Sequence, residues 1–256
     1  MIASLSIPGI IAIFVLLVVY TFLITEKLPK VLVSILGAAT LIVLQVFNTH
    51  DATPQENAFQ FVAHNLDILG FVIGMMVLVG IVRESGFFES AAIYLVKLVK
   101  GRPVALLIAI GYLTLVMTTF LSNIPTVLIL TPVVLVLVKQ LKLPVLPYLF
   151  TLVVMANIGG AMTPISDPTT YYQAKTVGLS FMEVMSNSGL IVLILSVVSI
   201  AYILLVFRKQ LAQAAKQDTD VSTFDPKSAL EDHYILKVGI PIIILSVLLM
   251  VLKDDI

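Results

Sequence analysis

The chain has 256 residues, of which 59% are hydrophobic and 12% charged, and its formal net charge is zero. A soluble domain of this size needs more polar surface to cover one hydrophobic core. The neutral charge does not indicate nucleic-acid binding, and the absence of cysteine excludes disulfides and thiolate metal sites. The apolar residues form runs close to the roughly 20 residues that cross a bilayer. The composition therefore predicts an all-α, polytopic helical membrane protein.

Several apolar runs have the length and composition of membrane spans. Spans are predicted over residues 7–24, 31–47, 68–82, 190–207 and 235–252. Residues 87–99 form a shorter apolar stretch with charged residues set into it, which suits a helix lying at the membrane interface.

Basic residues predict the orientation, because short cytoplasmic loops are enriched in Lys and Arg. The loop at residues 48–67 has neither, so it is assigned outside. The basic residues near 27–30, 83–102, 139–142 and 208–237 are then assigned inside. This orientation places the N-terminus outside a cell membrane that the chain crosses several times.

The segment between Arg102 and Lys139 is too short for two comfortable crossings, which need about 40 residues and a turn. Both basic residues are assigned inside, so we expect a re-entrant hairpin over residues 104–138 with Ser122 and Asn123 at its tip. The alternative is two short, tilted spans that place Ser122 at the outer surface.

Two polar interruptions, residues 122–126 and residues 157–170, break these apolar runs. Irregular backbone at membrane depth is tolerated only where it is buried in protein or lines a cavity. Transporters bind substrates and coupling ions at such broken helices. Ordinary kinks at proline and glycine are the alternative, but two breaks of similar polarity favour a binding site.

Each break also has the pattern of a helix start. Ser122 or Asn123 is expected to cap a helix with Pro125 in its first turn, and Asp167 to cap one that begins at Pro168. Helix starts present N–H groups to an anion, whereas freed carbonyl, Ser, Asn and Thr oxygens suit sodium. Asp167 either caps its helix alone or also contributes its charge to a bound cation or proton.

Three segments, residues 74–103, SNIPTVLILTPVV from Ser122 and NIGGAMTPISDPTT from Asn157, occur in a characteristic order and spacing. Together they resemble the arsenite permease and sodium/proton antiporter branch of the ion transporter superfamily, which includes P protein-like permeases and citrate transporter-like domains. The resemblance implies a first inverted repeat over residues 31–207 that follows a first span and cytoplasmic turn at residues 1–30. Within this repeat it implies two spans, an interfacial helix (87–99), a re-entrant hairpin (104–138), a broken helix (145–180) and a closing span (190–207). A cytoplasmic linker (208–234) and the opening span of a second repeat (235–256) are expected to follow.

The resemblance also implies an ion or substrate site framed by the hairpin tip and the broken helix. Its residues are Ser122, Asn123, Thr126, Asn157, Gly159, Gly160, Thr163 and Asp167. No metal is expected beyond a sodium ion at Ser122 and Asn123, and no cofactor beyond a coupling sodium ion or proton. Relatives near the P protein have Asp where this chain has Ser122, and the dicarboxylate branch has Ser-Asn there with sodium as coupling ion.

The predicted function is secondary active transport of a small ion, of the arsenite-type anion permease class. A sodium/proton antiporter and a sodium-coupled di- or tricarboxylate transporter are the alternatives, and a non-transporting membrane subunit or relic is an alternative of another class. No enzyme is predicted, because no HExxH or GxSxG motif is present. The expected partners are a small inorganic or carboxylate ion and the lipid bilayer. Because each site motif occurs once, we expect a half or truncated form that transports only with a second-half chain or as a homodimer.

Overall fold

The computed structural model describes residues 7–44, 46, 63, 66–216 and 233–253. The chain divides into one unit up to Leu69 and a second unit from Gly70 onwards. All regular elements of the described residues are α-helices, and four of them are long and apolar enough to cross a membrane. These four are α1 (Ile7–Thr25), α6 (Pro103–Phe120), α7 (Asn123–Gln140) and α10 (Phe181–Val206). The predicted all-α, polytopic class is confirmed.

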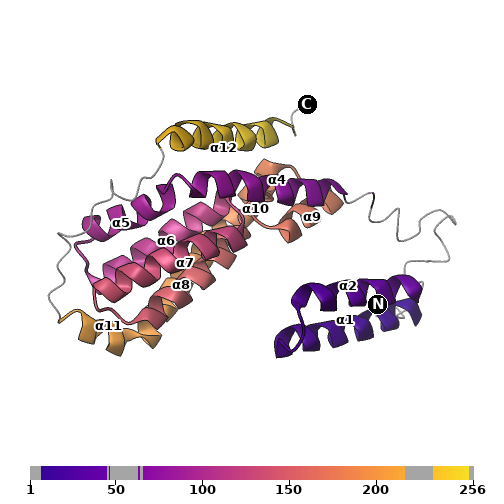
Figure 1. Cartoon of the computed structure of the whole chain (residues 1–256), viewed down its shortest axis with the longest axis horizontal. Helices are drawn as coiled ribbons and strands as arrows, with labels where there is room; N and C mark the ends of the chain where they lie inside the picture. Colours follow the sequence, from indigo (N-terminus) through magenta and orange to yellow (C-terminus); the bar gives the residue numbers. More distant parts are fainter. Residues whose placement is uncertain (1–6, 45, 47–62, 64–65, 217–232, 254–256) are drawn as a thin grey trace. The chain divides into compact units, whose positions relative to one another are not determined.

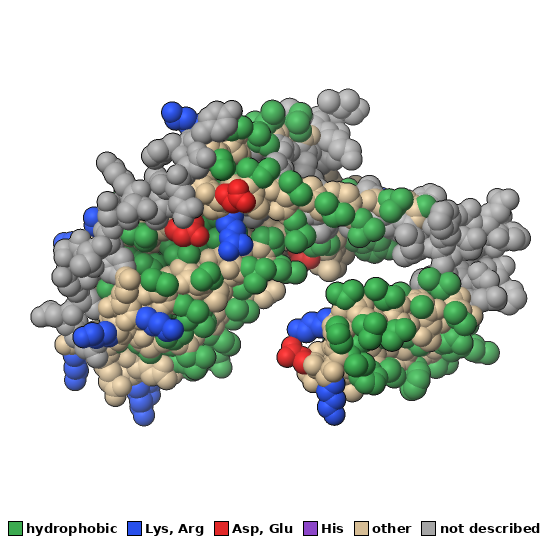
Figure 2. Space-filling view, in the orientation of Figure 1, with side chains coloured by type: hydrophobic (Ala, Val, Ile, Leu, Met, Phe, Trp, Pro, Cys, Tyr) green, Lys and Arg blue, Asp and Glu red, His purple; other side chains and the backbone are tan. Residues whose placement is uncertain are grey.

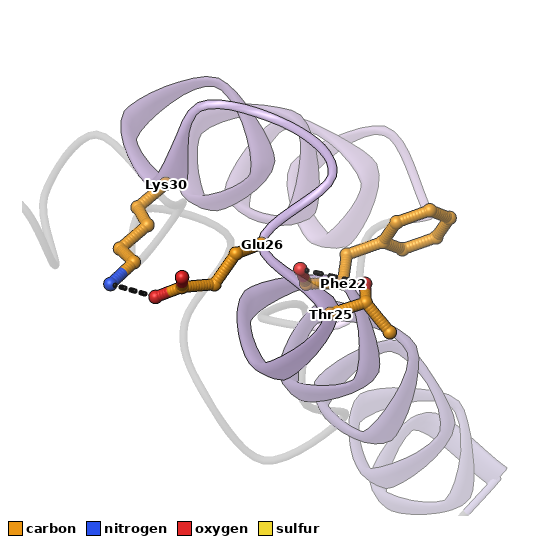
Figure 3. Close-up of polar contacts among 4 residues, drawn as sticks. All are labelled: Phe22, Thr25, Glu26 and Lys30. Atoms are coloured by element: carbon orange, nitrogen blue, oxygen red, sulfur yellow. Dashed lines mark hydrogen bonds and ion pairs between the residues drawn. The ribbon is translucent and has the colours of Figure 1, made fainter.

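The first unit is a helical hairpin made of α1 and α2 (Lys30–Val43). Its turn follows Glu26, which adopts a positive φ of 51° and whose Oε1 lies 2.8 Å from the Lys30 ammonium (Figure 3). In the same turn the Thr25 hydroxyl donates to the Phe22 carbonyl oxygen. Only Val33 and Gly37 are buried among the described residues of these two helices. The loop predicted at residues 48–67 lies almost entirely outside the described residues.

Among the described residues, eight further helices besides α6 lie wholly or mostly in the second unit, in the order shown in Figure 1. Two of them, α4 (Leu66–Arg83) and α5 (Phe87–Leu98), precede α6. The others besides α7 and α10 are α8 (Val145–Gly160), α9 (Pro168–Val177), α11 (Arg208–Ala214) and α12 (His233–Lys253). The segment at residues 217–232, within the predicted linker, lies outside the described residues.

Helices α6, α7 and α8 form the centre of this unit and lie side by side (Figure 1). At one end the Tyr148 hydroxyl of α8 donates to the Pro103 carbonyl oxygen of α6 over 2.9 Å. At the other end a methyl group added at Gly159 of α8 would lie 2.6 Å from the Leu115 carbonyl oxygen. Helices α6 and α8 therefore run parallel and α7 runs antiparallel to both. We name the Pro103 end the base and the Leu121–Ser122 end the tip.

Small residues allow α6 and α8 to approach closely. Gly111 faces Thr151, since a methyl group added at Gly111 would lie 2.9 Å from the Thr151 methyl carbon. The buried hydroxyls of Thr114, Thr118 and Thr151 donate to carbonyl oxygens of their own helices, so no buried donor is left unsatisfied there. Tight contact between glycine and threonine faces is how membrane helices associate, because lipid supplies no hydrophobic driving force between them.

Helix α10 runs antiparallel to α8, so positions along α10 measure the distance from the base end of the unit. Ile200 lies level with Gly111 near the middle of α6, and Gly189 lies level with Met162 just beyond α8. At about 1.5 Å per residue, Gly189 is about 26 Å from the base end of α10 at Val206 and about 12 Å from Phe181. Helix α10 thus continues past the tip of the α6–α7 hairpin by about two turns.

The start of α10 differs from the predicted closing span, which begins at residue 190. A capping box extends the helix to Phe181: the Glu183 amide donates to the Ser180 hydroxyl, and the Ser180 amide donates to the Glu183 carboxylate. The flanks of α10 are rich in exposed apolar side chains, including Leu190, Ile194 and Val198. Figure 2 shows many hydrophobic and few charged side chains on the visible surface, as expected for helices that face lipid.

Helix α5 packs along the α6–α7 hairpin through a buried stripe of Phe88, Ala92 and Val96. Its first turn shares an apolar pocket of about 390 Å³ with Phe120 and Leu121 at the tip and with residues of α12. Residues 87–99 are thus helical almost throughout, and the position of this helix at the membrane interface stays a prediction.

Candidate functional site

The two predicted breaks lie beside each other at the tip. The first is short: α6 ends at Phe120, Leu121 and Ser122 are extended, and α7 begins at Asn123. The second is longer, from the end of α8 at Gly160 to the start of α9 at Pro168. Side chains of the second break form hydrogen bonds with the first, so the structure brings two separate interruptions of the sequence into one cluster.

Two hydroxyls of the second break satisfy backbone groups at the end of α6. The buried Thr163 hydroxyl donates to the Thr119 carbonyl oxygen, and the buried Ser166 hydroxyl lies 3.0 Å from the Leu121 carbonyl oxygen. The last carbonyls of a helix have no intrahelical partner. The residue four positions after Leu121 is moreover Pro125, which has no N–H to donate. The break therefore acts as the cap of α6.

Asn123 lies at the centre of the cluster. Its side-chain nitrogen Nδ2 is 3.5 Å from Asp167 Oδ2, and its oxygen Oδ1 is 3.1 Å from the Ser166 hydroxyl. The amide fits against α8 because Gly160 has no side chain: a Cβ there would overlap all three polar-end atoms of Asn123. Gly160 thus allows the Asn123 amide to approach α8 closely.

Asp167 is the N-cap of α9, as predicted. Its Oδ1 accepts a hydrogen bond of 3.0 Å from the Thr169 amide, and Pro168 occupies the first helical position. Its other oxygen faces Asn123 across the cluster. The side chain is half-buried, so one carboxylate oxygen caps the helix while the other is directed to the hairpin tip.

Ser122 does not cap through its side chain. It occupies the N-cap position of α7 and makes no side-chain capping hydrogen bond. Its carbonyl oxygen instead accepts from both the amide and the hydroxyl of Thr126, at 3.2 and 3.0 Å. The expected cap at Ser122 is thus correct in position and wrong in mechanism, and its hydroxyl is left for another partner.

Gly159 and Asn157 lie outside the cluster. Gly159 packs against the backbone of α6, so its role is helix packing. Asn157 is exposed, donates to the Val153 carbonyl oxygen over 2.9 Å, and borders a groove of about 320 Å³ with Ser188 of α10.

Ser166 belongs to the cluster but was not among the predicted site residues. Its position within the second break, directly before the Asp167 cap, was a usable signal.

The donors of the cluster define its chemistry. They are one carboxylate, one carboxamide, side-chain hydroxyls and the positive ends of two helix dipoles. Within the part of the chain that the structure describes, no three His, Cys, Asp or Glu side chains lie close enough together to hold a metal ion. The carboxylate and neutral oxygens suit a monovalent cation or a proton, and the two helix N-termini suit an anion beside it.

Comparison with known proteins supports a transporter. The sequence profile of the citrate transporter family matches residues 20–255. A 46 kDa membrane protein of Mycobacterium leprae is 28% identical over 244 residues, which are 93% of this chain and 55% of that protein. An uncharacterized transporter of Mycobacterium tuberculosis is 28% identical over 89% of this chain and 52% of its own length.

The similarity extends to a mammalian protein. The P protein of Mus musculus is 32% identical over 176 residues, which are 66% of this chain and 21% of that protein. No solved structure matches the chain. The chain spans about half the length of the mycobacterial relatives.

Proposed function

Because this chain belongs to the citrate transporter family, we propose that it forms the ion-binding half of a secondary active transporter for a small ion. The observation that carries the proposal is the contact between the hairpin tip and the broken helix, where Asn123 meets Asp167. Two helix starts and one carboxylate converge there, as expected for a membrane site that binds an ion and releases it again.

The depth of the cluster supports this proposal. Helix α10 is about 39 Å long, and the cluster lies level with a point about 26 Å from its base end. With α10 crossing the bilayer, the tip lies inside the membrane with about two turns of α10 beyond it. The position of the tip along α10 favours the re-entrant hairpin over two tilted spans that would bring Ser122 to the outer surface.

The chemistry of the cluster favours coupling through a cation or proton held by Asp167. A carboxylate at membrane depth is costly unless it has a partner, and Asn123 supplies only a neutral one at 3.5 Å. The helix starts of α7 and α9 would receive the transported anion, an inorganic or carboxylate ion. We place the N-terminus outside the cell membrane, following the basic residues of the cytoplasmic turns.

We further propose that a complete site includes a second hairpin and broken helix, from a second-half chain or a second copy of this chain. Ser122, Asn123 and Asp167 are all half-buried, so each has a side open to such a partner. A non-transporting subunit is the competing function. In that case the only role of Asp167 would be to cap α9.

The change Asp167→Asn tests the proposal. Asn caps a helix about as well as Asp, so folding and thermal stability should be nearly unchanged. Loss of the charge should weaken ion binding at least about tenfold, which is about 1.4 kcal/mol. The measurement is sodium- or proton-dependent binding and flux of the active assembly, with Asn123→Ala as companion and Glu183→Gln as control. Unchanged ion affinity in Asp167→Asn would reduce Asp167 to a structural cap.

A further inference from the structure

We propose that Ser166 is a positioning residue. Its hydroxyl allows the Asn123 side-chain amide to flip, so that the amide nitrogen and oxygen exchange places, when the charge of Asp167 is neutralised. The inference rests on the proposed function, in which Asn123 and Asp167 bind the coupling ion. The Ser166 side chain is 1% exposed, and its hydroxyl faces the Leu121 carbonyl oxygen and the Asn123 amide rather than Asp167. Any effect of Ser166 on the coupling ion therefore acts through Asn123.

The Ser166 hydroxyl has two acceptors and only one proton. It lies 3.0 Å from the Leu121 carbonyl oxygen and 3.1 Å from Asn123 Oδ1, so it donates to one of them at a time. Its oxygen also has lone pairs, so it can accept a hydrogen bond from an amide nitrogen in the same place. A hydroxyl with this choice is compatible with either orientation of the neighbouring amide.

The orientation present in the structure is the one that an ionised, unloaded Asp167 requires. The Asn123 nitrogen donates to Asp167 Oδ2, and the Ser166 hydroxyl donates to Asn123 Oδ1. The opposite orientation would place the amide oxygen against a carboxylate oxygen, and two acceptors facing each other at this distance repel.

A cation or a proton on Asp167 reverses this preference. The Asn123 oxygen then serves better as a ligand of the cation, or as the acceptor of the acid proton, than its nitrogen does. The turned amide directs its N–H groups at the Ser166 oxygen, and the Ser166 hydroxyl donates to the Leu121 carbonyl oxygen. The Leu121 carbonyl oxygen thus receives the Ser166 proton only in the loaded state, because Pro125 leaves this carbonyl without an intrahelical donor.

Removal of the hydroxyl should penalise the loaded state more than the empty one. In Ser166→Ala the empty state loses one hydrogen bond, to Asn123 Oδ1. The loaded state loses two, from the amide nitrogen and to the Leu121 carbonyl oxygen. The net loss of one hydrogen bond predicts ion affinity about three- to tenfold weaker than in the wild type.

The experiment uses the full chain in nanodiscs, in the same active assembly in which ion binding is measured, with the asparagine side chains of this chain labelled with ¹⁵N. The Asn123 NH₂ signals are assigned by their loss in Asn123→Ala and followed while sodium chloride replaces choline chloride, and again while the pH is lowered in choline chloride alone. In the wild type we expect these signals to move between two positions. In Ser166→Ala the midpoint should move about three- to tenfold towards higher ion concentration.

Two further variants separate positioning from simple structural support. Ser196→Ala removes a buried hydroxyl that donates to the Leu193 carbonyl oxygen in α10, and it should leave the midpoint unchanged. Ser166→Thr keeps the hydroxyl and should restore the wild-type midpoint, and Ser166→Cys, which adds no bulky branch, should give an intermediate one because a thiol is a weaker donor.

A thermal stability loss in Ser166→Ala with an unchanged midpoint would overturn the inference and make Ser166 a cap of α6. Asn123 signals that respond to neither sodium nor acid in the wild type would overturn it as well. The proposed function fails separately, if Asp167→Asn and Asn123→Ala both leave ion binding unchanged. If those two variants abolish binding while Ser166→Ala keeps the wild-type midpoint, only the inference about Ser166 fails.

Discussion

Two of the helical hairpins, α1–α2 and α6–α7, have opposite chemistry at their turns. The α1–α2 turn carries Glu26, Lys27 and Lys30, and its ion pair is exposed. The α6–α7 tip carries no charge of its own, and its polar groups at Ser122 and Asn123 are half-buried. A turn in water can leave its polar groups to the solvent, whereas a turn within the membrane needs partners in the protein.

The hydrogen-bond partners that the α6–α7 tip receives from outside its own hairpin come, among the described residues, from the second break. Thr163 and Ser166 satisfy the end of α6, and Asp167 and Ser166 hold Asn123. Among the described residues, the side-chain contacts of the α1–α2 turn are local, from Glu26 to Lys30 and from Thr25 to Phe22. This difference favours the α6–α7 tip over the α1–α2 turn as the candidate functional site.

The largest difference between the α1–α2 turn and the α6–α7 tip should appear in chemical labelling of introduced cysteines. Such labelling is specific because the chain has no cysteine of its own. We expect Ser122→Cys to resist a bulky, membrane-impermeant maleimide added outside intact cells, since the proposed re-entrant hairpin places the tip within the membrane. Glu183→Cys, beyond the tip on α10, should react from outside. Glu26→Cys should react only after the cells are opened. Rapid outside labelling of Ser122→Cys would instead support two full spans.

The next comparison concerns the cost of replacing a glycine by alanine where two helices are in contact. A methyl group at Gly159 would overlap the backbone of α6 at Leu115, which can move only with the whole helix. We expect Gly159→Ala to destabilise the protein by about 2–3 kcal/mol, towards the upper part of the range for overpacked cores. At Gly37 the obstacle is the Val19 side chain, which can adjust, so Gly37→Ala should cost less than about 1 kcal/mol. Thermal unfolding in detergent measures both, and equal losses would contradict the contrast.

Gly160→Ala should affect binding more than stability. The added methyl group meets only the flexible end of Asn123, so the side chain can move aside at a cost of about 1 kcal/mol. That movement separates Asn123 from Asp167 and should weaken ion affinity at least about tenfold. Gly189→Ala is the matched control, since its methyl group would make an ordinary contact of 3.7 Å with Met162. Sodium titration of both variants provides the measurement, and wild-type affinity in Gly160→Ala would exclude Asn123 from the site.

Much of this architecture follows from the sequence, because long apolar runs and proline-marked breaks have direct physical meanings. The helix start at Asp167 and Pro168 is an example, since a capping carboxylate followed by proline specifies its own local structure. The role of Ser166 could not be predicted in this way. It depends on Leu121 and Asn123, more than 40 positions earlier in the chain, and only the tertiary packing of α6 against α8 brings them together.

Asn157 was implied as a site residue by the resemblance, but the structure places it outside the cluster. It lies three residues before Gly160 in α8, so the two positions are only about 60° apart around the helix. Asn157 nevertheless borders the groove beside α10, whereas Gly160 lies against the amide of Asn123. A role of Asn157 in ion binding therefore stays a prediction.

The smallest effect is expected at the α1–α2 turn. The hydrogen bond and charge of Lys30 hold the pKa of Glu26 below its ordinary value. A depressed carboxyl pKa stabilises the fold above the unfolded-state pKa, and this contribution disappears as the pH falls through the folded-state pKa. Because both side chains are about two-thirds exposed, with relative exposures of 67% and 69%, water and salt screen the pair strongly.

Glu26→Gln should therefore lower the melting temperature barely measurably at neutral pH and low salt. The difference from the wild type should vanish at about pH 3, where the glutamate is protonated, and also in about 1 M salt, where the Debye length is about 3 Å. Lys30→Gln, which removes the other partner, is expected to show the same dependence on pH and salt. A larger loss that persists at acid pH would mean that this turn, like the α6–α7 tip, is held by contacts other than its exposed ion pair.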